Sequence, residues 1–122
     1  MKFFITALIC FIAVISIIIF NCIYINNVSE ALLSYVDMAE NTEISQSSQI
    51  TKEIQSFWRD ECSKVSFSVS YTVIDRVEDY VTVLSAASNN QDAAKYKETL
   101  MLLRGVAEEI SRLERLSFSN IF

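Results

Sequence analysis

Three carboxylates within one helical turn come closest to a chemical site in this sequence. Asp75 and Asp79 stand four residues apart and lie on the same side of any helix that contains them, with Glu78 beside Asp79. A divalent cation such as calcium takes about six to eight oxygen ligands arranged around the ion. Three carboxylates on one helix supply too few, so we interpret the cluster as a solvated helix face.

The composition excludes most catalytic chemistry. The chain has no histidine, so it has neither an imidazole general base nor a histidine ligand for zinc. Gly105 is the one glycine, and a phosphate-binding loop needs several. Cys10 and Cys22 lie in a long apolar stretch, which leaves Cys62 without a C-x-x-C partner. We therefore expect no enzymatic activity, no catalytic or metal-ligating residues and no cofactor.

The charges are distributed unevenly along the chain. All fifteen acidic residues and nine of the ten basic residues lie beyond residue 25, where the net charge is −6. Proteins that bind nucleic acid carry clustered Lys and Arg side chains, whereas Lys95, Lys97 and Arg104 are interleaved with acidic residues. We expect no nucleic-acid partner and no polybasic patch for anionic lipid.

The first 25 residues decide where the rest of the chain lies. No charged residue occurs from Phe3 to Phe20, and the apolar run extends to Ile25. A helix of this length measures roughly 35 Å, which exceeds a hydrocarbon core of about 30 Å. We expect a transmembrane anchor over residues 1–25, with bilayer lipid as its surroundings.

Two other interpretations compete with an anchor. A secretory signal peptide has a shorter apolar core of about 7 to 15 residues and a small-x-small cleavage site, and Asn26-Asn27-Val28 is a poor site of this kind. A lipoprotein signal would place the lipid on Cys22. That processing requires a small residue before the cysteine, and Asn21 precedes it here.

Lys2 indicates the orientation of the anchor. Positive charge concentrates on the cytoplasmic side of membrane helices, and no other basic residue occurs before Lys52. We expect a single-pass protein of the cell membrane, with its N-terminus cytoplasmic and its C-terminal domain extracytoplasmic. Because only Met1 and Lys2 precede the apolar stretch, a sensing role is expected to depend on a second membrane protein.

Long helices are expected along the chain, since it lacks proline and places Asn and Ser at its polar breaks. The membrane helix is expected to continue to about residue 39 and to be followed by a polar break over 40–48. A second helix is expected from Gln49 to about Lys64, and a last helix follows a turn at 88–91. The candidate N-caps are Ser47, Ser48, Asn90 and Asp92. The apolar positions of these helices are Val28, Leu32, Val36, Ala39, Ile50, Ile54, Phe57, Trp58, Tyr96, Leu100, Leu103, Ala107, Ile110, Leu113 and Leu116.

Residues 65–73 allow two interpretations. They alternate apolar and polar side chains, which is typical of a half-buried strand. Apolar residues also recur every three or four positions from Val65 to Leu84, which is typical of a helix. A strand needs a partner, and no second alternating run exists in the sequence, so we predict a helix. The predicted fold is all-α: an N-terminal transmembrane helix followed by a small antiparallel helical bundle or hairpin over residues 49–122.

Large apolar side chains and one thiol are the candidates for partner contacts. Phe57 and Trp58 are expected in the core, because large aromatics fill space between helices, with an interface to a partner as the alternative. Cys62 is expected to be a buried free thiol, with a disulfide between two copies of the chain as the alternative. Gly105 is expected to mark close packing or a slight bend.

The end of the sequence carries three large apolar residues, Phe118, Ile121 and Phe122. Chain ends are usually polar or frayed unless they are docked. We expect this tail to fold back into a groove near the helical hairpin, with docking to a partner as the alternative.

The order of these features resembles an uncharacterised family of short, membrane-anchored helical proteins of Gram-positive, often spore-forming, bacteria, a domain of unknown function. The resemblance rests on Phe57-Trp58-Arg59, on Ile74-Asp75-Arg76-Val77-Glu78, and most specifically on the terminal Glu-x-x-Ser-x-x-Asn-Ile-Phe of residues 114–122. The resemblance implies an all-helical fold and assigns no activity to the chain. It also suggests a multi-pass membrane partner. Members often carry a histidine before the Ile-Asp stretch; here Tyr71-Thr72-Val73 occupies that region, so no role of that histidine carries over.

The function expected from these observations is protein–protein interaction. The chain would present an acidic helical domain outside the membrane to a protein partner, such as another membrane protein, or to a second copy of itself. The alternative is a ligand-binding or sensing module that acts through a membrane partner.

Overall fold

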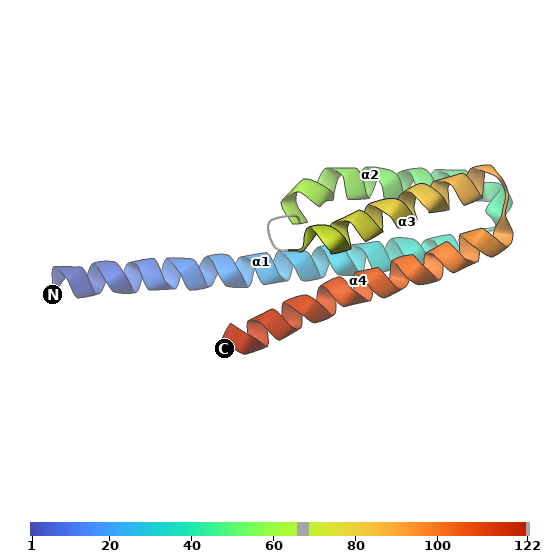
Figure 1. Cartoon of the computed structure of the whole chain (residues 1–122). Helices are drawn as coiled ribbons and strands as arrows, with labels where there is room; N and C mark the ends of the chain where they lie inside the picture. The colour runs from blue at the N-terminus through green and yellow to red at the C-terminus, as the bar shows by residue number, and fades with distance from the viewer. Residues whose placement is uncertain (66–68, 122) are drawn as a thin grey trace.

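The first helix, α1, runs without interruption from Lys2 to Glu40, which is about 58 Å at 1.5 Å per residue. The computed structural model describes residues 1–65 and 69–121, with side chains up to residue 113. Within these residues α1 has two halves in different surroundings. The half before Tyr24 projects beyond α2 and α3, with only the end of α4 running in the same direction, and the half after it lies among the other helices (Figure 1).

Three further helices complete an up-down-up-down bundle with the second half of α1. A short 3₁₀ turn, η1 (Ile44–Gln46), leads into α2 (Ser48–Val65), which is followed by α3 (Tyr71–Asn89) and α4 (Ala93–Ile121). Each helix contacts the next, and α4 returns to contact α1, so the four helices close into a ring (Figure 1). The described residues contain no strand, and the all-α prediction is confirmed.

The core is built from one apolar face of each helix. Because residues three and four positions apart share a helix face, the periodic apolar positions of the sequence converge on the bundle axis. The fully or almost fully buried members are Val28, Leu32, Val36, Ala39, Ile50, Ile54, Trp58, Val73, Val77, Val81, Leu84, Tyr96, Leu100, Leu103, Val106, Ala107 and Ile110. Leu113, which was expected to extend this face on α4, is instead 45% exposed, because it lies beyond the last buried turn of that helix.

The second half of α1 is one of the packed helices of the bundle. Leu32 and Val36 are fully buried, and α1 packs on both α2 and α4. The sequence placed the helical domain at residues 49–122, whereas the packed unit also requires residues 25–40. The apolar first half of α1 and the bundle therefore share one helix, and no linker separates them.

Residues 65–73 are neither one helix nor a strand where the structure describes them. Helix α2 ends at Val65 and α3 begins at Tyr71, with Val69 and Ser70 outside both helices. Prediction of a continuous helix through this segment was wrong. The absence of Gly, Pro and Asn suggested continuity, but Ser70 is the N-cap of α3 and has extended backbone, with φ of −63° and ψ of 150°, a position that serine favours. Residues 66–68 of this segment lie outside the described residues.

The turn between α3 and α4 lies where the Asn-rich sequence placed it. Asn90 follows the last residue of α3, and Gln91 adopts a left-handed backbone conformation with φ of 55°. Asp92 then caps α4, because its side-chain oxygen accepts a hydrogen bond of 3.1 Å from the Lys95 backbone N–H. The two helices run antiparallel as expected (Figure 1).

Two local expectations for α4 are wrong. Gly105 marks no close packing, since a Cβ built on it meets nothing within 4 Å. The tail does not fold back near the hairpin, because α4 continues as one helix to Ile121, away from the α3–α4 turn (Figure 1). No helix-breaking residue follows Gly105 in this segment, so the helix propagates to its end.

Replacing Gly105 with alanine should therefore stabilise the bundle. Gly105→Ala removes a flexible residue from an exposed helix interior without creating a clash, and we expect a gain of about 1 kcal/mol in the free energy of unfolding. Circular dichroism during thermal unfolding of the full chain in detergent measures this. Ala86→Gly, at an exposed position of α3, is the matched reverse change and should lose a similar amount. A lower melting temperature for Gly105→Ala would contradict the structure at this position.

Candidate functional site

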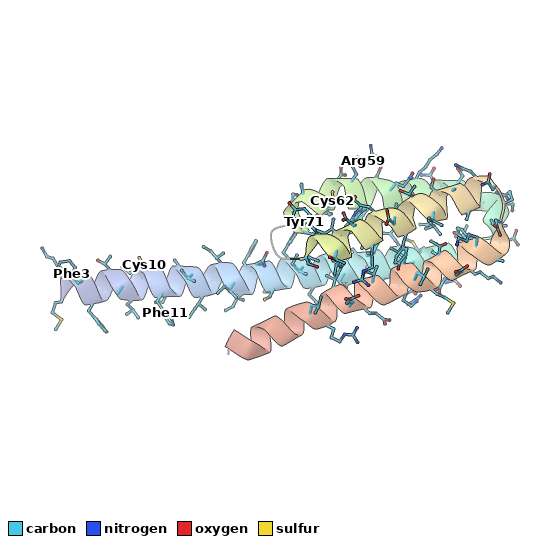
Figure 2. The ribbon with its side chains drawn as sticks, in the orientation of Figure 1. Phe3, Cys10, Phe11, Arg59, Cys62 and Tyr71 are labelled. Atoms are coloured by element: carbon cyan, nitrogen blue, oxygen red, sulfur yellow. The ribbon has the colours of Figure 1, made fainter. Side chains whose placement is uncertain are left out.

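The projecting half of α1 is an apolar surface that the bundle leaves bare. None of the eighteen most apolar residues of α1 is buried, and the helix is long and apolar enough to cross a membrane. Phe3 is 92% exposed and Phe20 is 75% exposed. Figure 2 shows Phe3, Cys10 and Phe11 along this bare half. A core helix of a globular protein would be covered, so this surface requires an apolar environment outside the molecule.

Polar contacts fix α1 against α4 where the bare half ends. The Ser29 hydroxyl is fully buried and donates to the Ala107 carbonyl over 2.6 Å. One turn nearer the bare half, the Ser111 hydroxyl donates to the Asn26 side-chain oxygen over 3.0 Å. Buried hydrogen bonds of this kind favour one register, because a shifted register would leave the groups unpaired.

The register places the end of α4 beside the bare half of α1. Because the two helices are antiparallel, each residue beyond Ser111 on α4 lies level with one residue before Asn26 on α1. Ile121 is therefore level with about Ser16, roughly 15 Å beyond the Asn26 contact. Figure 1 shows α4 extending past the adjacent ends of α2 and α3 along α1.

A second contact ties the end of α2 to the same level of α1. The Tyr24 hydroxyl donates a hydrogen bond to a carboxylate oxygen of Glu61. Lys64 lies in the last turn of α2 and lines a cleft with Phe20 and Tyr24. The end of the bundle beside the bare half of α1 thus combines a tyrosine, a lysine and exposed apolar surface.

The opposite end of the bundle carries a groove. It is about 620 Å³ in volume and is lined by η1 and the residues around it on one side, and by the first turns of α4 on the other. The apolar part of the lining includes Ile44, Leu100 and Met101, whose side chain is 72% exposed. Glu43 and Lys97 lie at the rim. We call this feature the distal groove.

Tyr96 forms the buried base of the distal groove. It is 4% exposed, and its hydroxyl donates to the Ala39 carbonyl over 3.2 Å, which satisfies a backbone acceptor near the end of α1. Burial raises the pKa of Tyr96 above its usual value, because the apolar surroundings disfavour the phenolate.

Ion pairs link α4 to its two neighbours on the bundle surface. Arg104 pairs with Asp37 and, over 2.8 Å, with Glu40 at the end of α1. Hydrogen bonding to Asp37, followed by Glu40, raises the pKa of the Arg104 guanidinium, which stays charged. Arg76 of α3 pairs with Glu109 of α4 over 3.0 Å. Solvent-exposed pairs of this kind contribute little to stability.

The two aromatic candidates on α2, Phe57 and Trp58, differ in burial. Trp58 is 3% exposed and lies in the core, so its interpretation as a core side chain is confirmed. Phe57 is half-buried and packs against Tyr35 of α1, with the ring centroids 5.2 Å apart and the planes at 47°. Only the uncovered part of Phe57 is available to a partner.

None of the three cysteines forms a disulfide within the described residues. Cys62 is half-buried near the C-terminal end of α2, and its Sγ donates to the Arg59 carbonyl over 3.6 Å. Figure 2 shows Cys62 and Tyr71 at this end of the bundle. Cys22, the candidate for lipidation, lies half-buried inside α1 with helix on both sides. The disulfide between copies and the lipidation of Cys22 stay predictions.

The three neighbouring carboxylates of the sequence lie on the exposed side of α3. Asp75, Glu78 and Asp79 are all exposed on α3. Within the part of the chain that the structure describes, no group of three Cys, Asp or Glu side chains is placed to hold a metal ion.

The last candidates for partner contacts are the apolar residues at the end of the sequence. Phe118 and Ile121 lie in the last turns of α4, where the side chains are outside the described part, and Phe122 lies outside the described residues.

The sequence analysis did not predict the polar residues of α1 that bond to the neighbouring helices. Tyr24, Asn26 and Ser29 interrupt the apolar run of α1 within two turns, and each bonds to another helix. Polar residues on an otherwise apolar helix face are the sequence signal for such contacts, since buried polar groups need partners. Of their partners, Ala107 was expected on the core face from periodicity, whereas Glu61 and Ser111 carry no signal that periodicity alone detects.

No family model, curated protein or solved structure matches the chain. The resemblance drawn from Phe57-Trp58-Arg59 and the terminal motif therefore stays a prediction, and function is argued from the geometry of the chain itself.

Tyr96→Phe tests the base of the distal groove. Loss of the hydroxyl leaves the Ala39 carbonyl without this donor, and we expect a loss of about 1 kcal/mol in the free energy of unfolding at pH 7. The raised pKa adds a pH dependence. The unfolded chain loses the phenolic proton near pH 10 while the folded chain keeps it, so the stabilisation is complete below pH 10 and declines as the pH rises through the folded pKa.

The difference between the natural chain and Tyr96→Phe should therefore shrink above pH 10. Urea unfolding of both proteins at pH 7 and above pH 10 measures it. A difference that is constant with pH would show that Tyr96 is not buried as described.

Proposed function

We propose that this chain is a non-enzymatic, single-pass membrane protein that presents an acidic helical bundle to a protein partner outside the cytoplasm. The observation that carries the proposal is the continuity of α1, which passes from a bare apolar half directly into the core of the bundle. In this proposal the N-terminus is cytoplasmic, as Lys2 predicts, and nucleic acid is not a partner.

The length and the apolar composition of the bare half support membrane insertion. About 20 residues of helix cross a hydrocarbon core of about 30 Å, and the charge-free stretch beginning at Phe3 supplies that length up to Cys22. Tyr24 follows at the level where aromatic side chains favour the membrane–water interface. The first charged residue after Lys2 is Glu30, a further turn and a half outside.

The shared helix determines how a partner would meet the bundle. Because α1 continues from the membrane into the core, the distal groove would be held at a fixed height, at the end farthest from the bilayer. Residues 25–40 of α1 make this height about 24 Å at 1.5 Å per residue. A protein partner fits the groove, because exposed Met101 and half-buried Ile44 offer an apolar centre between the charged rim residues Glu43 and Lys97.

The second candidate is a ligand-binding or sensing module that uses the same groove. Its volume of about 620 Å³ falls in the range of small-molecule sites, about 300–1,000 Å³. In that case a small apolar ligand would occupy the groove, and a membrane partner would carry the signal.

Membrane topology is tested first with single cysteines in a chain whose own cysteines are replaced by serine. Ser45→Cys, at an exposed position beside the distal groove, should react with a membrane-impermeant maleimide in intact cells. A cysteine inserted between Met1 and Lys2, which keeps the Lys2 charge, is the control and should react only after the membrane is opened. Labelling of this inserted cysteine alone in intact cells would contradict the proposed orientation.

The partner is tested by photocrosslinking in living cells. A photoreactive amino acid at Met101 should capture one stoichiometric protein, identified by mass spectrometry. The matched control is Thr82, which is exposed on α3 away from the groove and should capture none. Absence of a protein at Met101, together with a raised melting temperature in the presence of small apolar molecules, would favour the ligand-binding module instead.

A further inference from the structure

A second hollow lies at the membrane-proximal end of the bundle, beside the bare half of α1. This cleft has a volume of about 560 Å³ and is formed by one face of α1 and the end of α2. The described residues that line it are Ser16, Ile17, Phe20, Asn21, Tyr24 and Lys64. Most of its surface is apolar, and Lys64 is the charged residue among these six.

The cleft spans the boundary between hydrocarbon and headgroups in the proposed membrane position. Counting about 20 residues of hydrocarbon core from Phe3 places its edge near Cys22. Ile17 and Phe20 lie on the hydrocarbon side of that edge, and Tyr24 lies on the headgroup side. The bond between Tyr24 and Glu61 fixes the level of α2, so Lys64, about one turn farther along α2, reaches the edge itself.

Lys64 is available for an external anion. It is exposed, and it forms no ion pair within 4 Å among the described side chains. The carboxylate of Glu61, one turn away, accepts the hydrogen bond from Tyr24. A lysine at this depth buries its methylene chain in apolar surroundings and extends its ammonium toward the headgroups.

From this arrangement we propose that the cleft binds one anionic phospholipid of the outer leaflet. The Lys64 ammonium pairs with the lipid phosphate, and an acyl chain lies along Ile17 and Phe20. The proposal rests on the membrane insertion proposed above and adds a defined lipid site to it. Continuity of the cleft with the bare apolar surface of α1 favours a lipid over a soluble ligand.

The test uses the full chain in nanodiscs that contain equal amounts of phosphatidylglycerol and phosphatidylcholine. Native mass spectrometry then measures the ratio of the two lipids that stay bound to the protein. We expect phosphatidylglycerol to exceed phosphatidylcholine about fivefold, the effect of one basic residue near an anionic surface. Lys64→Gln should bring the ratio of phosphatidylglycerol to phosphatidylcholine to about one. Lys64→Arg, which keeps the positive charge, should retain the preference for phosphatidylglycerol.

Lys52→Gln is the matched control, because Lys52 is also exposed on α2 but lies about 18 Å farther from the membrane-proximal end. It should leave the ratio unchanged. Phe20→Ala should lower retention of both lipids and preserve the ratio, since it shortens the apolar contact only. A ratio near one for the natural chain, or an equal fall in Lys52→Gln, would overturn the proposal.

Two further arms separate this proposal from others. Millimolar inorganic phosphate should leave the bound lipid in place; displacement would identify a simple anion site and overturn the lipid site. Alkaline carbonate extraction tests membrane insertion separately. Release of the protein by carbonate would contradict the proposed function as well, whereas a retained protein without lipid preference would contradict only the lipid site.

Discussion

The structure depends on a single helix that must satisfy two environments in succession. Over its first half α1 presents apolar side chains in every direction, and over its second half it presents them on one face only. The change occurs between Tyr24 and Ser29, where three polar side chains bond to α2 and α4. These contacts determine which part of α1 belongs to the bundle, because a shift along the helix would bury them without partners.

The two ends of the bundle differ in chemistry because the helices end differently there. At the distal end, the short η1 turn and the α3–α4 turn leave the first turns of α4 partly uncovered, which creates the distal groove. At the proximal end, α2 stops at Val65 while α1 and α4 continue, which exposes the face of α1 beside Lys64. The distal groove follows from the two turns and the other cleft from unequal helix lengths, and neither interrupts the core.

The sequence predicted the fold well where one rule dominated. Apolar residues at intervals of three and four predicted the core faces of all four helices, and Asn89-Asn90 predicted the turn before α4. Prediction failed at Val69 and Ser70, which lie outside both helices although neither is a strong helix breaker. It also missed both candidate sites. Lys64 and Met101 are ordinary surface residues in the sequence and gain significance only from helices that pack beside them, which periodicity within one helix does not report.

The absence of a linker between the apolar half of α1 and the core has a mechanical consequence in the proposed orientation. A helix whose apolar length exceeds the local bilayer thickness accommodates the mismatch by tilting. Here the helix cannot tilt alone, since residues 25–40 are fixed in the bundle by Leu32, Val36 and the buried Ser29 bond. A tilt of about 10° would displace the distal groove sideways by about 4 Å over its 24 Å lever arm. Bilayer thickness would thereby set where the groove stands relative to its neighbours in the membrane.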